Sequence, residues 1–303
     1  MSGSSSSPEP QAPFALALSL AGAVTSQAFL FTAVLYYFGW AYAHAWFAYF
    51  GVDVGMLGLS VADYTLRSLT GAFWPVVIAL LGLLVLASAR RLPLVIAVRT
   101  RRPRQNLRRW YVVVLIVGTA LSATPGITWM VDRTVGPPLS TYLPGFLVVG
   151  AMLLGHAITL RSSCPALIGS GRTARRNTPR PAPTGVLVVL LALGFAGTIW
   201  GIGAYADRQA TTDARNLAQS RFPGRPSILV LSVDRLGIEG TGTQVNEFTV
   251  PGEKYRYVYS GLRMLARTPD TYFLVPQQWE LNRDRVFVVP RTDSLRIDID
   301  RHA

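Results

Sequence analysis

The stretch VLVVLLALGFAGTIWGIGAYA, residues 186–206, contains no Asp, Glu, Lys or Arg. An apolar run of about 20 residues is long enough to cross the hydrocarbon core of a bilayer as a helix. Four more uncharged apolar runs occupy residues 14–39, 72–88, 110–131 and 142–160. Only 15% of the 303 residues are charged, against roughly 25% in soluble domains. The sequence therefore predicts a membrane all-α bundle of about five transmembrane helices.

The first apolar run is longer than one crossing requires. Residues 13–52 carry no formal charge, and as one helix they would extend about 60 Å, twice the hydrocarbon thickness. A second crossing would place the following Arg-rich segment outside, against the usual location of basic loops. We therefore predict one span at residues 14–39 and an exterior segment at residues 40–71. Nine aromatic residues within 36–50 indicate an interfacial anchoring belt, with a ligand-binding aromatic cage as the alternative.

The net charge of +13 resides in two short segments between predicted spans. Residues 90–109 contain eight Arg, residues 161–184 contain five, and neither segment contains an acid. Because cytoplasmic loops are enriched in Lys and Arg, both segments are predicted to be cytoplasmic. The N-terminus is then cytoplasmic and the C-terminal part extracytoplasmic, in a multi-pass protein of the cell membrane that contacts the lipid bilayer. The basic segments lack interleaved aromatics for base stacking, so no nucleic-acid partner is predicted.

The chain divides into three predicted parts. Residues 1–13 form a disordered cytoplasmic tail, and residues 14–206 form the five-helix transmembrane domain. Residues 207–303 form an extracytoplasmic helix followed by a small C-terminal β-rich domain. The helix is indicated by alanines recurring every four residues, and the domain by β-branched and aromatic runs bounded by Gly, Pro and Asp. Strands are expected at 227–233, 245–250, 255–259, 262–267, 271–275, 285–289 and 295–299, with a hairpin turn at 268–270.

Few polar residues outside the spans are candidates for a site. Ser60 and Asp63 have the spacing of a capping box, and Asp63 and Arg67 that of a favourable helical pair. Asp53 has no partner nearby in sequence. His44, Asp53, Asp63 and Arg67 are therefore the candidate exterior polar cluster, and the sequence leaves open whether they are close in space.

Two glycines in the last span, Gly197 and Gly201, form a GxxxG pattern that lets helices approach closely. Packing within the bundle is expected in preference to dimerisation. No catalytic residue, metal site or cofactor is predicted, because the chain has three His, one Cys, no HExxH and no phosphate-binding loop.

The leading hypothesis is a non-enzymatic envelope protein that displays its exterior β domain for binding or assembly, with a possible envelope protein partner held through residues 226–303. Two alternatives remain open. One is a transporter or channel component for an uncharged or lipid-like solute, since the predicted spans lack ionisable Asp, Glu, Lys and Arg side chains. The other is an interfacial membrane enzyme that uses His44, Asp53 and Asp63.

Two stretches resemble a known group of proteins. They are YFGVDVGMLGLSVADYTLRS at residues 49–68 and YSGLRMLARTPDTYFLVPQQW at residues 259–279. Both are similar to stretches of multi-pass membrane proteins of high-GC Gram-positive bacteria that have no assigned function. The resemblance implies a bacterial membrane setting, and no functional residue is carried over from it.

Overall fold

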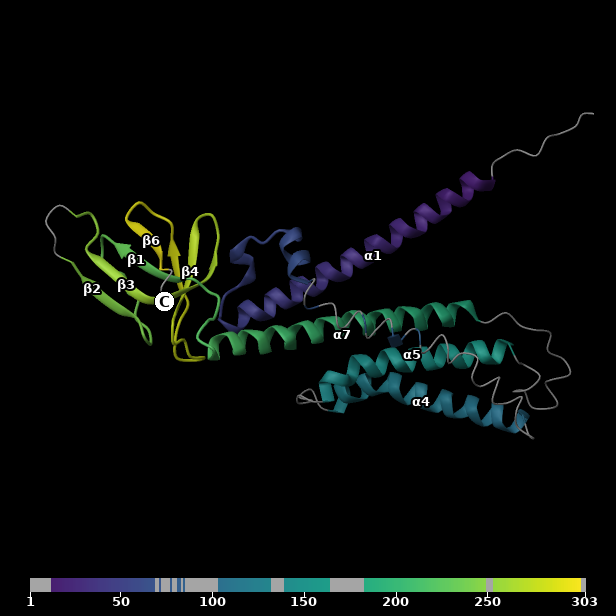
Figure 1. Ribbon diagram of the computed structural model, residues 1–303. Coiled ribbons are helices and arrows are strands. Elements are labelled where there is room, and N and C mark those ends of the chain that lie inside the picture. The colour runs from purple at the N-terminus through teal and green to yellow at the C-terminus, as the bar shows by residue number, and fades with distance from the viewer. Residues whose placement is uncertain are drawn as a thin grey trace, which may run out of the picture. The chain divides into compact units, whose positions relative to one another are not determined.

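The computed structural model describes residues 12–68, 71, 77, 81–82, 84, 103–131, 139–163, 183–248 and 253–300. The N-terminal tail to residue 11, most of the span predicted at 72–88 and most of both Arg-rich segments lie outside the described residues. The chain divides into two compact units, one of Met1–Gly71 with Asp207–Ala303 and one of Ala72–Ala206. Figure 1 labels the elements of both.

Within the described ranges, three helices are long and apolar enough to cross a membrane. They are α4 (Pro103–Val131), α5 (Leu139–Ser163) and α7 (Thr184–Gln219). Their large apolar side chains are widely exposed, among them Leu191 at 76% and Met130 at 81%. Such surface is stable in lipid and costly in water. The protein is therefore a membrane protein, and the helices predicted at 110–131, 142–160 and 186–206 are confirmed.

The aromatic stretch at 36–50 continues the first helix. Helix α1 (Ala12–Tyr49) runs unbroken for 38 residues without a formal charge, so the stretch is the C-terminal end of this helix rather than a separate segment. A short helix, η1 (Val54–Leu57), follows after Gly51, and another helical turn begins at residue 61. Helix α7 also extends beyond its apolar part to Gln219, as the alanine spacing predicts.

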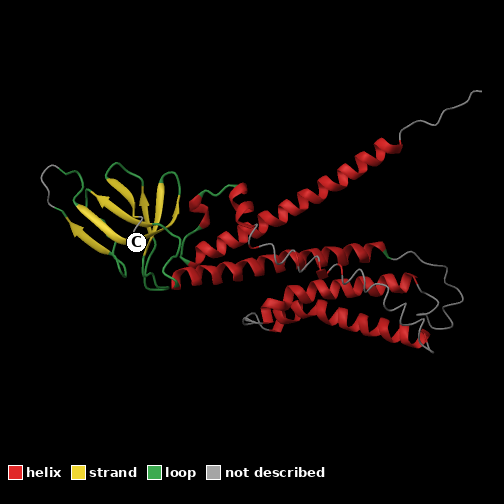
Figure 2. Cartoon of the chain, in the orientation of Figure 1, coloured by secondary structure: helices red, strands yellow, loops and turns green. Residues whose placement is uncertain are grey.

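The C-terminal domain is one antiparallel sheet (Figure 2), made of the strands β1 (Ser227–Ser232), β2 (Gln244–Glu247), β3 (Tyr257–Arg267), β4 (Thr271–Pro276), β5 (Phe287–Pro290) and β6 (Leu295–Asp300). The order is β5-β4-β3-β1-β6, and β2 also pairs with β3. The sequence predicted two strands where β3 is one. Gly261 (φ +76°) lies in a bulge of β3 opposite β1, which interrupts the alternation without ending the strand. The hairpin turn at 268–270 is confirmed by the hydrogen bond from the Thr268 N–H to the Thr271 carbonyl.

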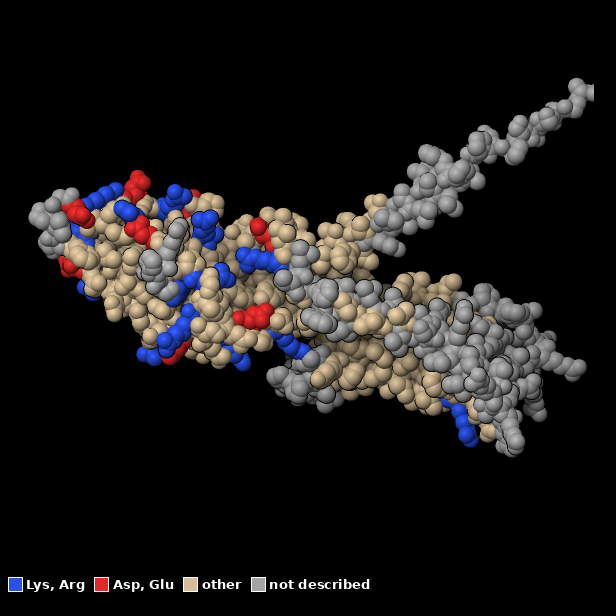
Figure 3. Space-filling model, in the orientation of Figure 1, with Lys and Arg blue, Asp and Glu red and all other residues tan. Residues whose placement is uncertain are grey.

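Two hydrophobic cores cover the two faces of the sheet. The first joins Phe273, Val275 and Trp279 of the sheet side to the aromatic end of α1 and to Ala210 and Ala214 of α7. The second contains Ile228, Val230, Tyr259, Leu262 and Leu274, and the loop residue Ile238 packs on it. Charged side chains gather over the sheet and its loops, whereas the described helices carry few (Figure 3). The first core thus fixes the sheet to the C-terminal ends of α1 and α7.

Candidate functional site

The predicted exterior polar residues are engaged locally and face solvent. The exposed His44 ring stacks on Trp40 with centroids 5.6 Å apart. The Asp53 carboxylate caps η1 by accepting the Gly55 N–H at 2.8 Å. Asp53 therefore has a structural role in its turn, and His44 contacts a ring of its own helix.

The predicted capping box of Ser60 and Asp63 is confirmed. One Asp63 carboxylate oxygen accepts the Ser60 N–H at 2.8 Å and the Ser60 hydroxyl at 2.7 Å, and the Ser60 oxygen accepts the Asp63 N–H. These hydrogen bonds lower the pKa of the Asp63 carboxyl. Among the described residues, Asp63 and Arg67 form no ion pair within 4.0 Å, because the Arg67 guanidinium lies over the Phe47 ring, 5.6 Å from its centroid.

Among the described residues, no hydrogen bond or ion pair joins His44, Asp53 and Asp63 to one another. Neither a cavity of about 640 Å³ nor one of about 420 Å³ is lined by any of the three. Arg67, the fourth candidate, lines the smaller cavity. A shared catalytic role for the three side chains remains a prediction, since a base, acid and nucleophile must lie within hydrogen-bond reach of one reacting group.

Arg67 instead belongs to a pocket that sequence reasoning missed, with a volume of about 420 Å³. We call it the arginine–aromatic pocket; it is lined by Tyr42, Trp46, Arg67, Gly71, Gln209, Asp213 and Arg225. The first two residues lie on the C-terminal end of α1, and Gln209 and Asp213 lie on the extension of α7. Arg225 follows the end of α7 just before β1, so the pocket exists only when three distant parts of the chain are folded together.

Asp213 is the acid of this pocket, and two neutral groups hold it in place. The Tyr42 hydroxyl donates to one carboxylate oxygen at 2.8 Å, and the Gln209 amide donates to both at 3.1 and 3.2 Å. Burial and the bond to Asp213 raise the pKa of Tyr42. Tyr42 therefore stays protonated at neutral pH and remains a donor to Asp213.

Each of the two guanidinium groups of the pocket rests on an aromatic ring. Arg225 lies over Trp46, 5.4 Å from the ring centroid, and donates to the Leu265 carbonyl at 3.2 Å. Burial, and then the charge of Arg67, lowers the pKa of Arg225. Stacking on aromatic rings leaves the edge of a guanidinium, which carries its N–H donors, free to meet an acceptor.

No local sequence pattern predicted this pocket. Tyr42 and Asp213 are 171 residues apart, and each looked like an ordinary interfacial tyrosine or helical acid. Arg225 lies in the turn SRFPGRP, where the chain passes from helix to strand. The one available signal was position along the chain. Tyr42 lies three residues after the first predicted span, and Asp213 and Arg225 lie seven and nineteen residues after the last one.

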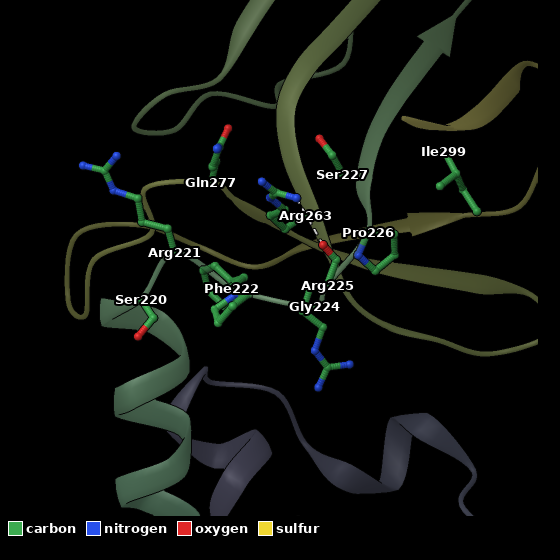
Figure 4. Close-up of a pocket in the computed structure, with 11 residues that line it drawn as sticks. Ser220, Arg221, Phe222, Gly224, Arg225, Pro226, Ser227, Arg263, Gln277 and Ile299 are labelled. Carbon is green, nitrogen blue, oxygen red and sulfur yellow. Dashed lines mark hydrogen bonds between the residues drawn. The ribbon is translucent and has the colours of Figure 1, made fainter. Parts of the chain in front are cut away.

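A second, wider cavity of about 640 Å³ lies on the other side of this turn and is lined by Ser220 to Ser227, Arg263, Gln277 and Ile299. The Arg263 guanidinium donates to the Arg225 carbonyl at 3.1 Å. The Arg225 side chain points away from Arg263 (Figure 4). Arg225 therefore contributes its main chain to this cavity and its charge to the arginine–aromatic pocket.

The turn between the cavities is a helix-ending motif with an unusual residue. The Phe222 N–H donates to the Leu217 carbonyl and the Arg221 N–H to the Ala218 carbonyl, the two bonds of a Schellman motif. Arg221 has φ +59° at the position that glycine usually occupies. The left-handed conformation is unfavourable for a residue with a Cβ.

Arg221→Gly is expected to stabilise the C-terminal domain by about 0.5–1 kcal/mol, because glycine adopts this conformation without strain but loses more entropy on folding. Thermal unfolding of the full-length protein measures it. Phe222→Gly is the contrast: Phe222 also has φ +59°, but its ring is 1% exposed, so its removal should destabilise. A lower unfolding temperature for Arg221→Gly would contradict the argument.

The two packing glycines lie where α7 meets α5. A Cβ on Gly197 would lie 3.0 Å from the Val148 side chain and 3.1 Å from that of Leu147, and one on Gly201 would lie 3.4 Å from Pro144. Both glycines thus face a neighbouring helix of the same unit. The expected role in packing within the bundle remains a prediction.

Comparisons with known proteins identify no relative of this chain. No family model matches it, no curated protein matches it, and no solved structure matches it. Within the described ranges, no group of three His, Cys, Asp or Glu side chains could hold a metal ion. Function is therefore inferred from the geometry of the C-terminal domain.

Proposed function

We propose that the protein is a non-enzymatic envelope protein of a bacterial cell membrane that displays its C-terminal domain on the outer face for binding or assembly. Its N-terminus and Arg-rich segments are cytoplasmic in this proposal, and about five helices span the bilayer. The observation that carries it is a sheet with an unpaired edge strand, fixed to the ends of two long apolar helices. A partner bound to that edge would be held at a defined place near the membrane.

One free edge of the sheet is β6, and the strand at the other end of the order is β5. Ser294 and Val233 lie directly opposite each other in the β1–β6 register and share a hydrogen bond from the Val233 N–H to the Ser294 carbonyl. Backbone groups of an antiparallel strand alternate between its two neighbours. Those of Leu295, Ile297 and Ile299 therefore point away from β1. An extended peptide could pair with them by β-augmentation.

The side chains of β6 restrict which partner can pair there. Arg296 and Asp298 form an ion pair, with 2.9 Å between Nε and Oδ1, and charges on an edge strand oppose indiscriminate pairing. Ile299 is 62% exposed, although it lies beside the buried Ile228 in register. An exposed apolar side chain at an open edge supports a contact with another chain.

Ile299→Pro tests this proposal. Proline removes the outward N–H of residue 299 while leaving the bonds to β1, since those come from residues 298 and 300. The full-length protein, purified from native membranes, should lose its co-purifying partner with this change. Ile299→Val, which keeps the N–H, should retain the partner, as mass spectrometry would show.

Retention of the same partner by Ile299→Pro would exclude the β6 edge as the binding surface. A version ending at residue 206 provides the second comparison, because a partner that it also retains is held by the transmembrane helices. Thermal unfolding must first show that Ile299→Pro is folded. Asp298→Pro provides the reference for an unstable variant, because it removes a hydrogen bond between β6 and β1.

A further inference from the structure

The arginine–aromatic pocket has more positive than negative charge. Its described lining contains Arg67, Arg225 and Asp213, which together give a formal charge of +1. Among the described residues, neither guanidinium lies within 4.0 Å of a carboxylate oxygen. The acid therefore does not pair directly with either cation.

The donors of the two arginines are largely unused. Arg67 forms no hydrogen bond with the described part of the chain, and its recorded contact is with the Phe47 ring. Arg225 uses one N–H for the Leu265 carbonyl. A guanidinium carries five N–H donors in a planar fork that fits a carboxylate or phosphate. Two such forks, each stacked on an aromatic ring, thus line one cavity without a directly paired carboxylate among the described residues.

The two cations lie close enough to disfavour each other. Part of the reduction in the pKa of Arg225 comes from the charge of Arg67, after the larger effect of burial. Bringing two like charges together while burying one of them costs free energy unless an anion compensates. Asp213 accepts hydrogen bonds from Tyr42 and Gln209 and pairs with neither arginine among the described residues, so a bound anion would add a direct partner for both guanidinium groups.

The position of the pocket along its helices indicates where that anion is found. Tyr42 lies three residues beyond the span predicted at 14–39, and Asp213 lies seven residues beyond the one predicted at 186–206. At 1.5 Å per residue these are heights of about 5 and 10 Å above the hydrocarbon. Polar headgroups occupy about 5–8 Å on each side of a bilayer. Tyr42 thus lies at the level of the headgroups, and Asp213 lies just beyond them.

We propose that the arginine–aromatic pocket binds a phosphate-class anion, held by the guanidinium groups of Arg67 and Arg225. Bidentate hydrogen bonds from the two forks provide its affinity. The cavity of about 420 Å³ accommodates a phosphate group with a small substituent. The anion comes either from the headgroup of an anionic phospholipid or from free phosphate, and the chemistry of recognition is the same for both.

Titration of the full-length protein in a phosphate-free maltoside detergent tests the proposal, with isothermal calorimetry as the readout. One arm uses a soluble short-chain phosphatidylglycerol and the other uses inorganic phosphate. We expect the wild-type protein to bind at least one of them, and Arg67→Gln to bind it at least about tenfold more weakly, since charge-assisted hydrogen bonds are lost. Arg67 is exposed and anchors no other described element, so this variant should fold.

Arg215→Gln is the matched control. It removes the same charge from the exposed part of α7, two residues from Asp213, but Arg215 does not line the pocket. Its affinity should equal that of the wild type, whereas Asp213→Asn should bind the anion more tightly. Equal affinities for wild type, Arg67→Gln and Arg215→Gln would overturn the proposal, as would absence of binding in both arms. Binding of the lipid alone identifies the headgroup as the source, and equal binding of inorganic phosphate identifies the free anion.

Discussion

Gly261→Ala is expected to destabilise the C-terminal sheet by about 3 kcal/mol or more. Gly261 has φ +76° at the bulge of β3, and a Cβ there would overlap the carbonyl oxygen of Gly242. The left-handed conformation alone costs an alanine about 1–2 kcal/mol, and main-chain atoms cannot move aside as a flexible side chain can. Thermal unfolding of the full-length protein measures the loss of stability. The rate of proteolytic cleavage at sites C-terminal to residue 220 should also increase.

Gly237→Ala is the control for this prediction. Gly237 lies in the loop that follows β1, its φ is not in the left-handed region, and an added Cβ would meet nothing within 4 Å. Its stability should change by no more than about 0.5 kcal/mol. Similar effects of the two substitutions would show that the bulge at Gly261 is not required by the fold.

Phe50→Ala should loosen the sheet from the end of α1 at a cost of about 3–5 kcal/mol. Phe50 is 4% exposed, and its ring centroid lies 5.0 Å from that of Trp279 and 5.9 Å from that of Phe222. It therefore joins the segment after α1 to the loops of the sheet. Hydrogen exchange should increase in both partners of this contact, and the thermal unfolding temperature should fall.

Phe248→Ala removes the same side chain from a position that is 49% exposed and outside both cores. Its effect should be below about 1 kcal/mol, since little apolar surface is uncovered. If Phe50→Ala had an equally small effect, the sheet and α1 would be coupled by something other than this aromatic cluster.

Predictions of helices and turns from the sequence succeeded where the signal is local. The capping box of Ser60 and Asp63 depends on residues three apart, and the structure shows its hydrogen bonds. The extension of α7 follows from its alanines, of which Ala210 and Ala214 are fully buried. Asp63 and Arg67 form no ion pair within 4.0 Å, and the Arg67 guanidinium lies over the Phe47 ring of another helix, although its charge still contributes to lowering the pKa of Asp63.

Apolar helices long enough to cross a membrane, the strand-rich segment that follows them and the location of the positive charge were all predictable from the residues alone, because hydropathy and side-chain periodicity are properties of neighbouring residues. The shared pocket of Tyr42, Asp213, Arg225 and Arg67 became visible only in the folded chain, as did the fact that His44, Asp53 and Asp63 do not line it. These residues come from segments up to 183 positions apart, and their approach depends on how α1, α7 and the sheet pack around one core.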